Sequence, residues 1–322
     1  MLETIRVSAE EYEKTVLDRR VFFNEPKFTE LNKDKADDVL YLVTKKGNSP
    51  RFGVIIGKCG GVGRSPFSAP YAYPVTIRND AGVQDFDDAL ASIEEYCLRE
   101  GIRELRFVFP PFLYDEDVLS AWASSMYRAG YRLSNVDINY TLDLCKLNTA
   151  EYPQMLGKKA RSHLRKAMNS GIDVIRCKND EDYKEAYDII VENHTLKDRP
   201  THMTYEQVKN TFKLVYHEAF IARLNGKPIA SMIYYEITKE IVQCIYSGYL
   251  LEYSNSGVMN YLSWYAIRFF GDKGYKYIDR AIATEDSMPN YGLCDFKESV
   301  GCERSLKFSF RKELKKEYNH DD

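Results

Sequence analysis

The chain has 322 residues, of which 44% are hydrophobic and 29% are charged, and its formal net charge is −3. This composition is ordinary for a globular protein, and the charge excludes a global attraction to nucleic acid or to an anionic membrane. A chain of this length exceeds what one hydrophobic core usually supports, so we expect two domains.

The cysteine pattern bears on the compartment. There are seven cysteines, an odd number, and no two of them form a C-x-x-C pair, which argues against a disulfide framework or a zinc site. The segment MLETIRVSAEEYEK lacks the apolar core of a signal peptide, and no apolar stretch approaches the ~20 residues that span a bilayer. We therefore expect a cytoplasmic protein with no metal and no membrane span; its oligomeric state stays open.

In the first half, residues 38–77 predict strands separated by turns. Within them, the glycine-rich segment 59–66 is expected to be a mobile turn, because it has neither a phosphate-loop nor a dinucleotide-binding spacing. Apolar residues at helical spacing predict a helix at 86–100, with an inward face of Phe86, Leu90, Ile93 and Cys97. The other elements expected here are a strand at 105–109, a helix at 118–128 and a strand at 136–144.

The second half begins with a predicted helix at 152–170. Segment 219–250 predicts three antiparallel strands, and Asn225-Gly226 is a typical two-residue hairpin turn. A long helix is expected at 257–273. The remaining predicted elements are a strand at 172–176, helices starting at Asp180 and near Thr204, a strand at 275–281, a short helix at 291–300 and a final strand at 305–310.

The two halves share one pattern, in which strands lead to a helix, then glycine, then a short strand. The segments EEYCLREGIRELRF and IRFFGDKGYKYIDR show it best. The pattern predicts a duplicated α/β unit, with an N-terminal domain at 1–148 and a C-terminal domain at 149–322.

Several segments of the second half occur in an order and spacing that resemble one superfamily. They are KKARSHLRKAMNSGIDV (158–174), ARLNGKPIASMIYY (222–235), IVQCIYSGYL (241–250), SNSGVMNYLSWYAI (254–267), GYKYIDR (274–280) and GLCDFKESVG (292–301). Together they resemble the GNAT superfamily in its FemAB-like and BioF2-like acetyltransferase branch. SPFSAPYAYP (65–74) is similar to the degenerate N-terminal domain of that branch. The resemblance implies tandem GNAT domains in a mixed α/β fold, and an enzyme that moves an acyl group from coenzyme A, or an aminoacyl group from tRNA, onto an amine.

The start of the long helix is the candidate donor site. A helix N-terminus exposes unpaired N–H groups and a partial positive charge, and this first turn carries no Asp or Glu that would neutralise it. The resemblance places the coenzyme A pyrophosphate here and its pantetheine arm along strand 241–249, beside a gap in the sheet near Tyr246, Ser247 and Gly248. The usual R/Q-x-x-G-x-G/A loop is absent, and Ser-Gly-Val-Met stands in place of its glycine repeat. The alternative is an ordinary capped helix. The candidate cofactor-binding residues are Ser247, Gly248, Ser254, Ser256, Gly257, Val258, Met259 and Asn260.

Three residues are candidates for catalysis. The resemblance places Lys297, in a Phe-Lys motif, near the reacting carbonyl, where a fixed ammonium would stabilise an oxyanion. Tyr246 could protonate a leaving thiolate, and Asp279 could take a proton from the attacking ammonium if burial raises its pKa. The alternatives are a surface lysine, a sheet tyrosine, and a salt bridge between Asp279 and Arg280.

Two further features concern the partners that the protein would bind. Arg161 and Arg165 share one face of a basic helix with Lys158, which an anionic partner would stabilise, and His194 lies where an acceptor-binding loop is expected. The sequence thus predicts an N-acyltransferase with acetyl-CoA or another acyl-CoA as co-substrate and an amine acceptor, small or peptide-like, between the domains. The alternatives are an aminoacyl-tRNA-dependent transferase acting on a cell-wall precursor, and a non-catalytic relative that binds a ligand.

Overall fold

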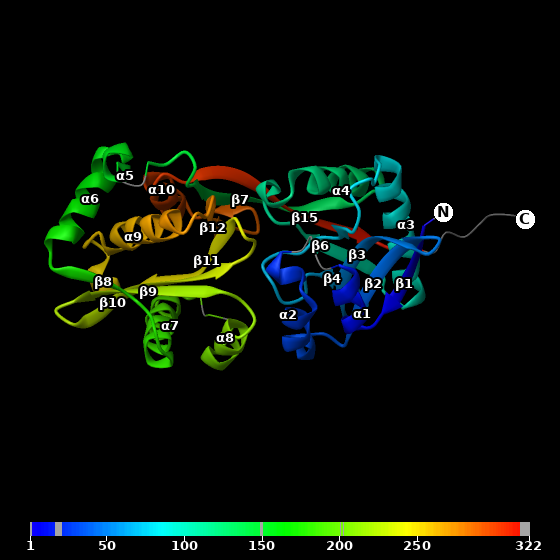
Figure 1. Cartoon of the computed structure of the whole chain (residues 1–322), viewed down its shortest axis with the longest axis horizontal. Coiled ribbons are helices and arrows are strands. Elements are labelled where there is room, and N and C mark those ends of the chain that lie inside the picture. Colours follow the sequence, from blue (N-terminus) through cyan, green and yellow to red (C-terminus); the bar gives the residue numbers. More distant parts are fainter. Residues whose placement is uncertain (1, 17–20, 149–150, 200, 202, 316–322) are drawn as a thin grey trace, which may run out of the picture. The chain divides into compact units, whose positions relative to one another are not determined.

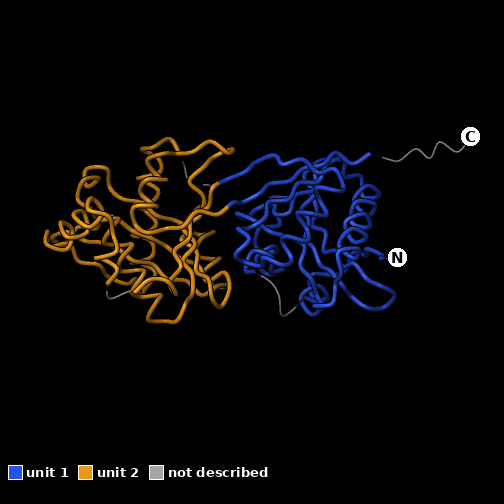
Figure 2. Tube along the Cα trace, turned by 90° about the horizontal axis from the view of Figure 1, so that it is seen from above, with its two compact units in different colours: residues 1–137, 306–322 blue, residues 138–305 orange. Residues whose placement is uncertain are grey.

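The computed structural model describes residues 2–16, 21–148, 151–199, 201 and 203–315. The chain divides into two compact units, residues 1–137 with 306–322 (unit 1) and residues 138–305 (unit 2), which Figure 2 colours separately. These units are not the consecutive segments 1–148 and 149–322 that the sequence suggested, because the last strand of the chain pairs with a strand of unit 1.

Unit 1 contains a mixed sheet with the strand order β1-β2-β3-β4-β6-β15, in which only β4 and β6 are parallel. Its elements are β1 (Glu3–Val7), α1 (Ala9–Thr15), α2 (Pro26–Leu31), β2 (Asp38–Lys46), β3 (Ser49–Cys59), β4 (Val62–Ser65), β5 (Val75–Thr76), α3 (Val83–Arg99), β6 (Glu104–Val108) and α4 (Glu116–Arg128). Two strands cross the unit boundary: β7 (Arg132–Asp143) ends in unit 2, and β15 (Glu303–Glu313) ends in unit 1.

Helices cover both faces of this sheet (Figure 1). A Cβ added to Gly53 of β3 would lie 3.0 Å from the Tyr12 hydroxyl of α1, whereas the neighbouring Phe52 packs on Trp122 of α4, with ring centroids 5.2 Å apart. Successive strand residues point to opposite faces, so α1 and α4 lie on opposite sides. The predicted inward face of α3 is confirmed, since all four of its members are buried: Phe86, Leu90, Ile93 and Cys97.

The glycine-rich segment 59–66 is not the mobile turn that we expected. Val62–Ser65 forms β4, which pairs with both β3 and β6. A Cβ on Gly63 would lie 2.8 Å from the Leu105 side chain, so glycine is what lets β4 fit beside its neighbours. The sequence pattern was misleading because a four-residue strand that contains glycine is too short to show the alternation of apolar and polar residues that predicts a strand.

Unit 2 contains the strand order β7-β12-β11-β10-β9-β8, in which only β11 and β12 are parallel. Its elements are α5 (Tyr152–Met155), α6 (Lys158–Asn169), β8 (Ile172–Arg176), α7 (Asp180–Thr195), α8 (Tyr205–Phe212), β9 (His217–Leu224), β10 (Lys227–Glu236), β11 (Ile241–Tyr249), α9 (Val258–Asp272), β12 (Tyr277–Ile282), the hairpin β13 (Thr284–Glu285) and β14 (Met288–Pro289), and α10 (Tyr291–Ser299).

Helices α7 and α9 lie on opposite faces of the unit 2 sheet (Figure 1). On β10, the Ser231 hydroxyl donates to the Ala186 carbonyl of α7, while Tyr234 packs on Phe270 of α9. The three antiparallel strands predicted within 219–250 are confirmed as β9, β10 and β11. Between the first two, Asn225-Gly226 turns with both φ angles positive, as a two-residue hairpin requires.

The helix predicted at 152–170 is two helices, α5 and α6, separated at residues 156–157. Arg161 of α6 stabilises the break, because its Nη2 donates to the carbonyls of Gln154 (2.6 Å) and Leu156 (2.8 Å). These hydrogen bonds satisfy carbonyl groups that the interrupted helix leaves free.

Candidate functional site

The parallel strands β11 and β12 of unit 2 separate after a short ladder. Only Ile241–Gln243 pairs with Tyr277–Asp279, after which β11 continues beside β10 and β12 beside β7. Residues 244–249, here called the free edge of β11, have no strand on the side of β12 among the residues that the structure describes. The gap that we expected beside Tyr246, Ser247 and Gly248 is therefore present in the sheet.

Helix α7 ends against this free edge. His194 Nε2 lies 3.2 Å from the Ser247 carbonyl, and the Asn193 side-chain amide donates to the Tyr249 carbonyl. Gly248 makes this approach possible, because a Cβ there would lie 2.8 Å from the Ile190 Cα. The structure thus brings together three residues that the sequence singled out separately, namely His194, Ser247 and Gly248.

Burial shifts the proton equilibria of two side chains at this edge. It lowers the pKa of His194, so the ring is neutral near pH 7, with a proton on Nε2 facing the carbonyl and a lone pair on Nδ1. Burial raises the pKa of Tyr246 to about 12. A phenol this weakly acidic is a poorer proton donor to a thiolate than the ordinary tyrosine that we assumed.

Asp279 is completely buried where β11 and β12 part. Its carboxylate accepts from Asn139 Nδ2 (2.9 Å), Gln243 Nε2 (3.1 Å) and the Ala281 N–H (2.7 Å). A carboxylate enclosed by three donors is suited to fixing the backbone around it. Ala281 has φ +59°, a left-handed conformation that costs a non-glycine residue roughly 1–2 kcal/mol and that the bond to Asp279 helps to hold.

Lys297 extends from α10 to this backbone. Its Nζ donates to the carbonyls of Ala281 (3.0 Å) and Ile282 (2.8 Å), and the residue is only 5% exposed. Burial, and secondly the charge of Arg280, lower the pKa of Lys297 to about 8. Lys297 is therefore a buried lysine held by two main-chain carbonyls. The surface lysine that was the sequence alternative is excluded.

The start of α9 is more enclosed than the sequence suggested. Ser256 Oγ accepts from the Val258 N–H (3.2 Å) and the Gly257 carbonyl accepts from the Asn260 N–H (3.1 Å), so two of the expected anion-binding amides have partners. Gly257, with φ +78°, packs so closely on α6 that a Cβ would lie 2.2 Å from the His163 carbonyl oxygen. The predicted members are half-buried or buried except Ser254, which is exposed: Ser256 and Met259 (half-buried), Gly257, Val258 and Asn260 (buried).

The basic helix α6 lies beside this helix start, where Lys166 Nζ donates to the Asn255 carbonyl (2.9 Å). Arg165 is exposed, whereas Arg161 is half-buried at the break after α5. Within the described part of the chain, no carboxylate lies within 4.0 Å of the cations of α6: Lys158, Lys159, Arg161, Arg165 and Lys166.

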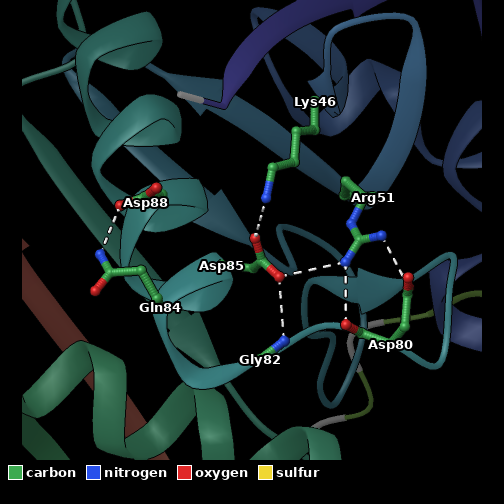
Figure 3. Close-up of polar contacts among 7 residues, drawn as sticks. All are labelled: Lys46, Arg51, Asp80, Gly82, Gln84, Asp85 and Asp88. Carbon is green, nitrogen blue, oxygen red and sulfur yellow. Dashed lines mark hydrogen bonds and ion pairs between the residues drawn. The ribbon is translucent and has the colours of Figure 1, made fainter.

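In unit 1 the corresponding helix start and the corresponding position in the sheet are occupied by the chain itself. Asp85, in the first turn of α3, accepts from the Gly82 N–H (3.1 Å) and pairs with Arg51 (3.3 Å) and Lys46 (3.5 Å), as Figure 3 shows. This carboxylate occupies the place of an external anion. The chain also occupies the position beyond the β4–β6 ladder. The ladder ends at Phe107, and the Ala72 N–H donates to the carbonyl of the next residue, Val108 (2.9 Å).

Across the described residues, no group of three or more His, Cys, Asp or Glu side chains is arranged to hold a metal ion. All seven cysteines are unpaired. In the same part of the chain, no helix has the length and apolar character of a membrane crossing.

Arg280 is a site residue that the sequence did not reveal, because it was considered only as a salt-bridge partner of Asp279.

Comparisons with known proteins identify the fold. No family model matches the chain, and no curated protein matches it significantly by sequence. Among solved structures, FemX aligns with a TM-score of 0.67 at 12% identity, covering 97% of both chains. A tandem GNAT protein from the clavulanic acid biosynthesis pathway aligns at 0.60 and 10% identity, covering 98% of this chain and 99% of that one. L-PGS from Bacillus licheniformis aligns at 0.60 and 14%, covering 96% and 93%.

At these identities the likeness concerns the fold, and there it agrees with the resemblance drawn from the sequence segments. The α/β class and the duplication predicted from the two halves are both confirmed. The chain has the tandem GNAT fold, in the form shared with FemX.

Proposed function

We propose that this chain is an N-acyltransferase that moves an acyl group from acetyl-CoA, or another acyl-CoA, to a small or peptide-like amine. The observation that carries the proposal is the free edge of β11, with Lys297 at the point where β12 turns away. Among the described residues of unit 1, the segment after β4 and the Asp85 carboxylate occupy the equivalent positions. The donor is therefore assigned to unit 2.

The free edge offers main-chain groups to an extended donor. The Leu250 N–H donates to the Ile229 carbonyl, and in an antiparallel ladder this register directs the N–H groups of Ser247 and Tyr249 away from β10. His194 and Asn193 bind the carbonyls of the same two residues. The N–H groups are thus the natural partners for the amide carbonyls of a pantetheine arm.

Lys297 is the proposed catalytic residue. A lysine with a pKa near 8 is mostly protonated at pH 7, and its charge would stabilise the oxyanion that forms when the amine attacks the thioester. Asp279 is proposed as a positioning residue, because it fixes the backbone carbonyls that hold Lys297. Tyr246 lines the donor edge, and His194, neutral and with a free Nδ1, is proposed to meet the acceptor amine.

The phosphates of the donor are assigned to the start of α9 beside α6, where Ser254 is exposed and Lys166 binds the Asn255 carbonyl. Arg165 is the exposed arginine of α6 and is assigned to this site as a further cation. Because the Val258 and Asn260 N–H groups already donate within this turn, the Met259 N–H is the first-turn amide assigned to the phosphates. Calorimetric titration with acetyl-CoA tests the assignment. Binding that is lost in Arg165→Ala supports it, and no binding at millimolar acetyl-CoA rejects it.

One observation favours an aminoacyl-tRNA donor instead. The cations of α6 have no described carboxylate partner, and such a surface suits a phosphate backbone. The test is a tRNA gel shift with Lys158→Ala, Lys159→Ala and Arg165→Ala combined, which spares Arg161 because that residue stabilises the break before α6. A shift that disappears in this variant would favour the tRNA donor. Either activity fits a cytoplasmic location, which the unpaired cysteines support.

A further inference from the structure

Two consecutive charged residues of β12 point to opposite faces of the sheet, as successive strand residues do. Asp279 faces Gln243 and Asn139, as described above, while Arg280 faces α9. There its Nη1 donates to Ser263 Oγ (3.2 Å) and lies 3.7 Å from the Met232 sulfur. Arg280 is 6% exposed, and no carboxylate of the described chain lies within 4.0 Å of it. A buried guanidinium without a counter-ion is costly, so its presence calls for a reason.

Lys297 shares this interior with Arg280. An ammonium has three N–H groups, and two of them bind the carbonyls of Ala281 and Ile282. The third has no acceptor among the described residues, and Nζ lies 5.6 Å from the centroid of the Tyr140 ring. The proton that is not hydrogen-bonded is the one available for transfer.

The titratable groups near enough to act on Lys297 come from several elements. They are Arg280 and Asp279 of β12, Cys244 of β11, Tyr140 of β7 and Cys302 before β15. Burial raises the pKa of Cys244, and that of Cys302 to about 12, so both thiols are neutral near pH 7. Burial also raises the pKa of Tyr140. Arg280 is therefore the charged neighbour that opposes the proton on Lys297, and Asp279 the one that favours it.

We propose that Lys297 donates a proton to the leaving group of the acyl donor, and that Arg280 is the positioning residue that makes this proton transferable. The proposal rests on the proposed function and names a second role within it. The comparison with Tyr246 favours Lys297, because a thiol has a pKa of about 8.5 and a matched acid transfers its proton best. Tyr246, with a pKa of about 12, is poorly matched.

The step balances with the groups present. The amine nitrogen attacks the thioester carbon, a C–N bond forms, and the carbonyl electron pair moves to oxygen. When the carbonyl re-forms, the C–S bond breaks and its electron pair goes to sulfur, which takes the proton of Lys297 to give the free thiol. The neutral Lys297 then takes the proton that the new amide nitrogen loses, and the next cycle starts with the ammonium.

The titration of Lys297 tests the part played by Arg280 without any substrate. In protein labelled with ¹⁵N-lysine, the Lys297 amine signal is the one missing from Lys297→Met, and its shift is followed from pH 6 to 11. We expect a midpoint near pH 8. Arg280→Met should lower the acid dissociation constant of Lys297 tenfold or more, whereas Arg280→Lys, which keeps the charge, should restore it to within threefold.

Arg223→Met is the matched control, because Arg223 lies in the same unit and pairs with Glu185 at its surface. It should leave the Lys297 titration unchanged. A native midpoint near 10.4, or equal effects of Arg280→Met and Arg223→Met, would overturn the role of Arg280. If Arg280→Met does not fold, as judged by circular dichroism, Arg280→Gln replaces it, and the native midpoint remains decisive by itself.

A donor series tests the proton transfer. Lys297→Met should slow thiol release from acetyl-CoA at least 100-fold but slow release from an S-aryl thioacetate less than tenfold, because an aryl thiolate departs without a proton. Equal losses with both donors overturn the acid role. If the native protein uses neither donor with any amine, the proposed function and the acid role of Lys297 both fail. The lysine titration would still decide whether Arg280 acts on Lys297.

Discussion

Lys297→Met should make the native stability of the protein less dependent on pH in the alkaline range. The pKa of Lys297 is about 8 in the fold, against about 10.4 for an unfolded lysine. At about 1.4 kcal/mol per pH unit, keeping the ammonium buried costs about 3 kcal/mol. Below pH 8 the cost is fully present. Between pH 8 and 10.5 the unfolded chain holds more protons here than the folded chain, so stability rises with pH.

The assay is urea denaturation of both proteins at pH 7.5, 8.5, 9.5 and 10.5. The stability of the native protein minus that of Lys297→Met should rise by about 3 kcal/mol across this range. All other titrating groups are common to both proteins and cancel in this difference. The two carbonyls that lose their hydrogen bond to Lys297 shift the difference by an amount that does not depend on pH. Lys273→Met, at an exposed lysine of the same unit, should show no such rise. A flat difference for Lys297→Met would refute the reasoning that the lysine is destabilised by burial.

Three further changes follow from the same geometry. Gly248→Ala should destabilise by about 1–3 kcal/mol in thermal melting, because its Cβ would meet the α7 backbone at 2.8 Å, whereas Gly292→Ala, at an exposed position of α10 whose nearest neighbouring atom would be 3.8 Å away, should not. His194→Gln should reduce the loss of stability below about pH 6.5, since burial lowers the pKa of His194. An unchanged dependence of the melting temperature on pH between pH 5 and 8 would contradict this. Asp85→Ala should cost about 1 kcal/mol and leave acetyl-CoA binding unaltered, and altered binding would contradict the placement of the donor in unit 2.

Local signals allowed much of unit 2 to be predicted from the sequence. Asn225-Gly226 specified a hairpin because few residue pairs adopt two positive φ angles. The apolar runs on either side then fixed β9, β10 and β11, and the parallel strand β12 followed the long helix. The gap beside Tyr246 was reached only through family resemblance, since no periodicity marks the residue at which two strands part.

The remaining features depend on contacts between distant residues. The break before α6 is stabilised by Arg161, and nothing in an uninterrupted apolar pattern marks it. Strand β4 was not recognised because its Gly63 leaves room for Leu105, and that requirement comes from a residue distant in the sequence. Lys297 was found by its motif, but its burial beside Arg280 depends on a backbone bulge at Ala281 that no local sequence signal announces.

The pairing of β15 with β6 has a consequence for biosynthesis. Residues 104–108 emerge from the ribosome about two hundred residues before Ser309–Glu313, their partner in the ladder. Throughout that interval the nascent chain presents an incomplete sheet margin, which is prone to pairing with other extended polypeptides. Premature termination before residue 303 would therefore harm the part of the protein that is synthesised first.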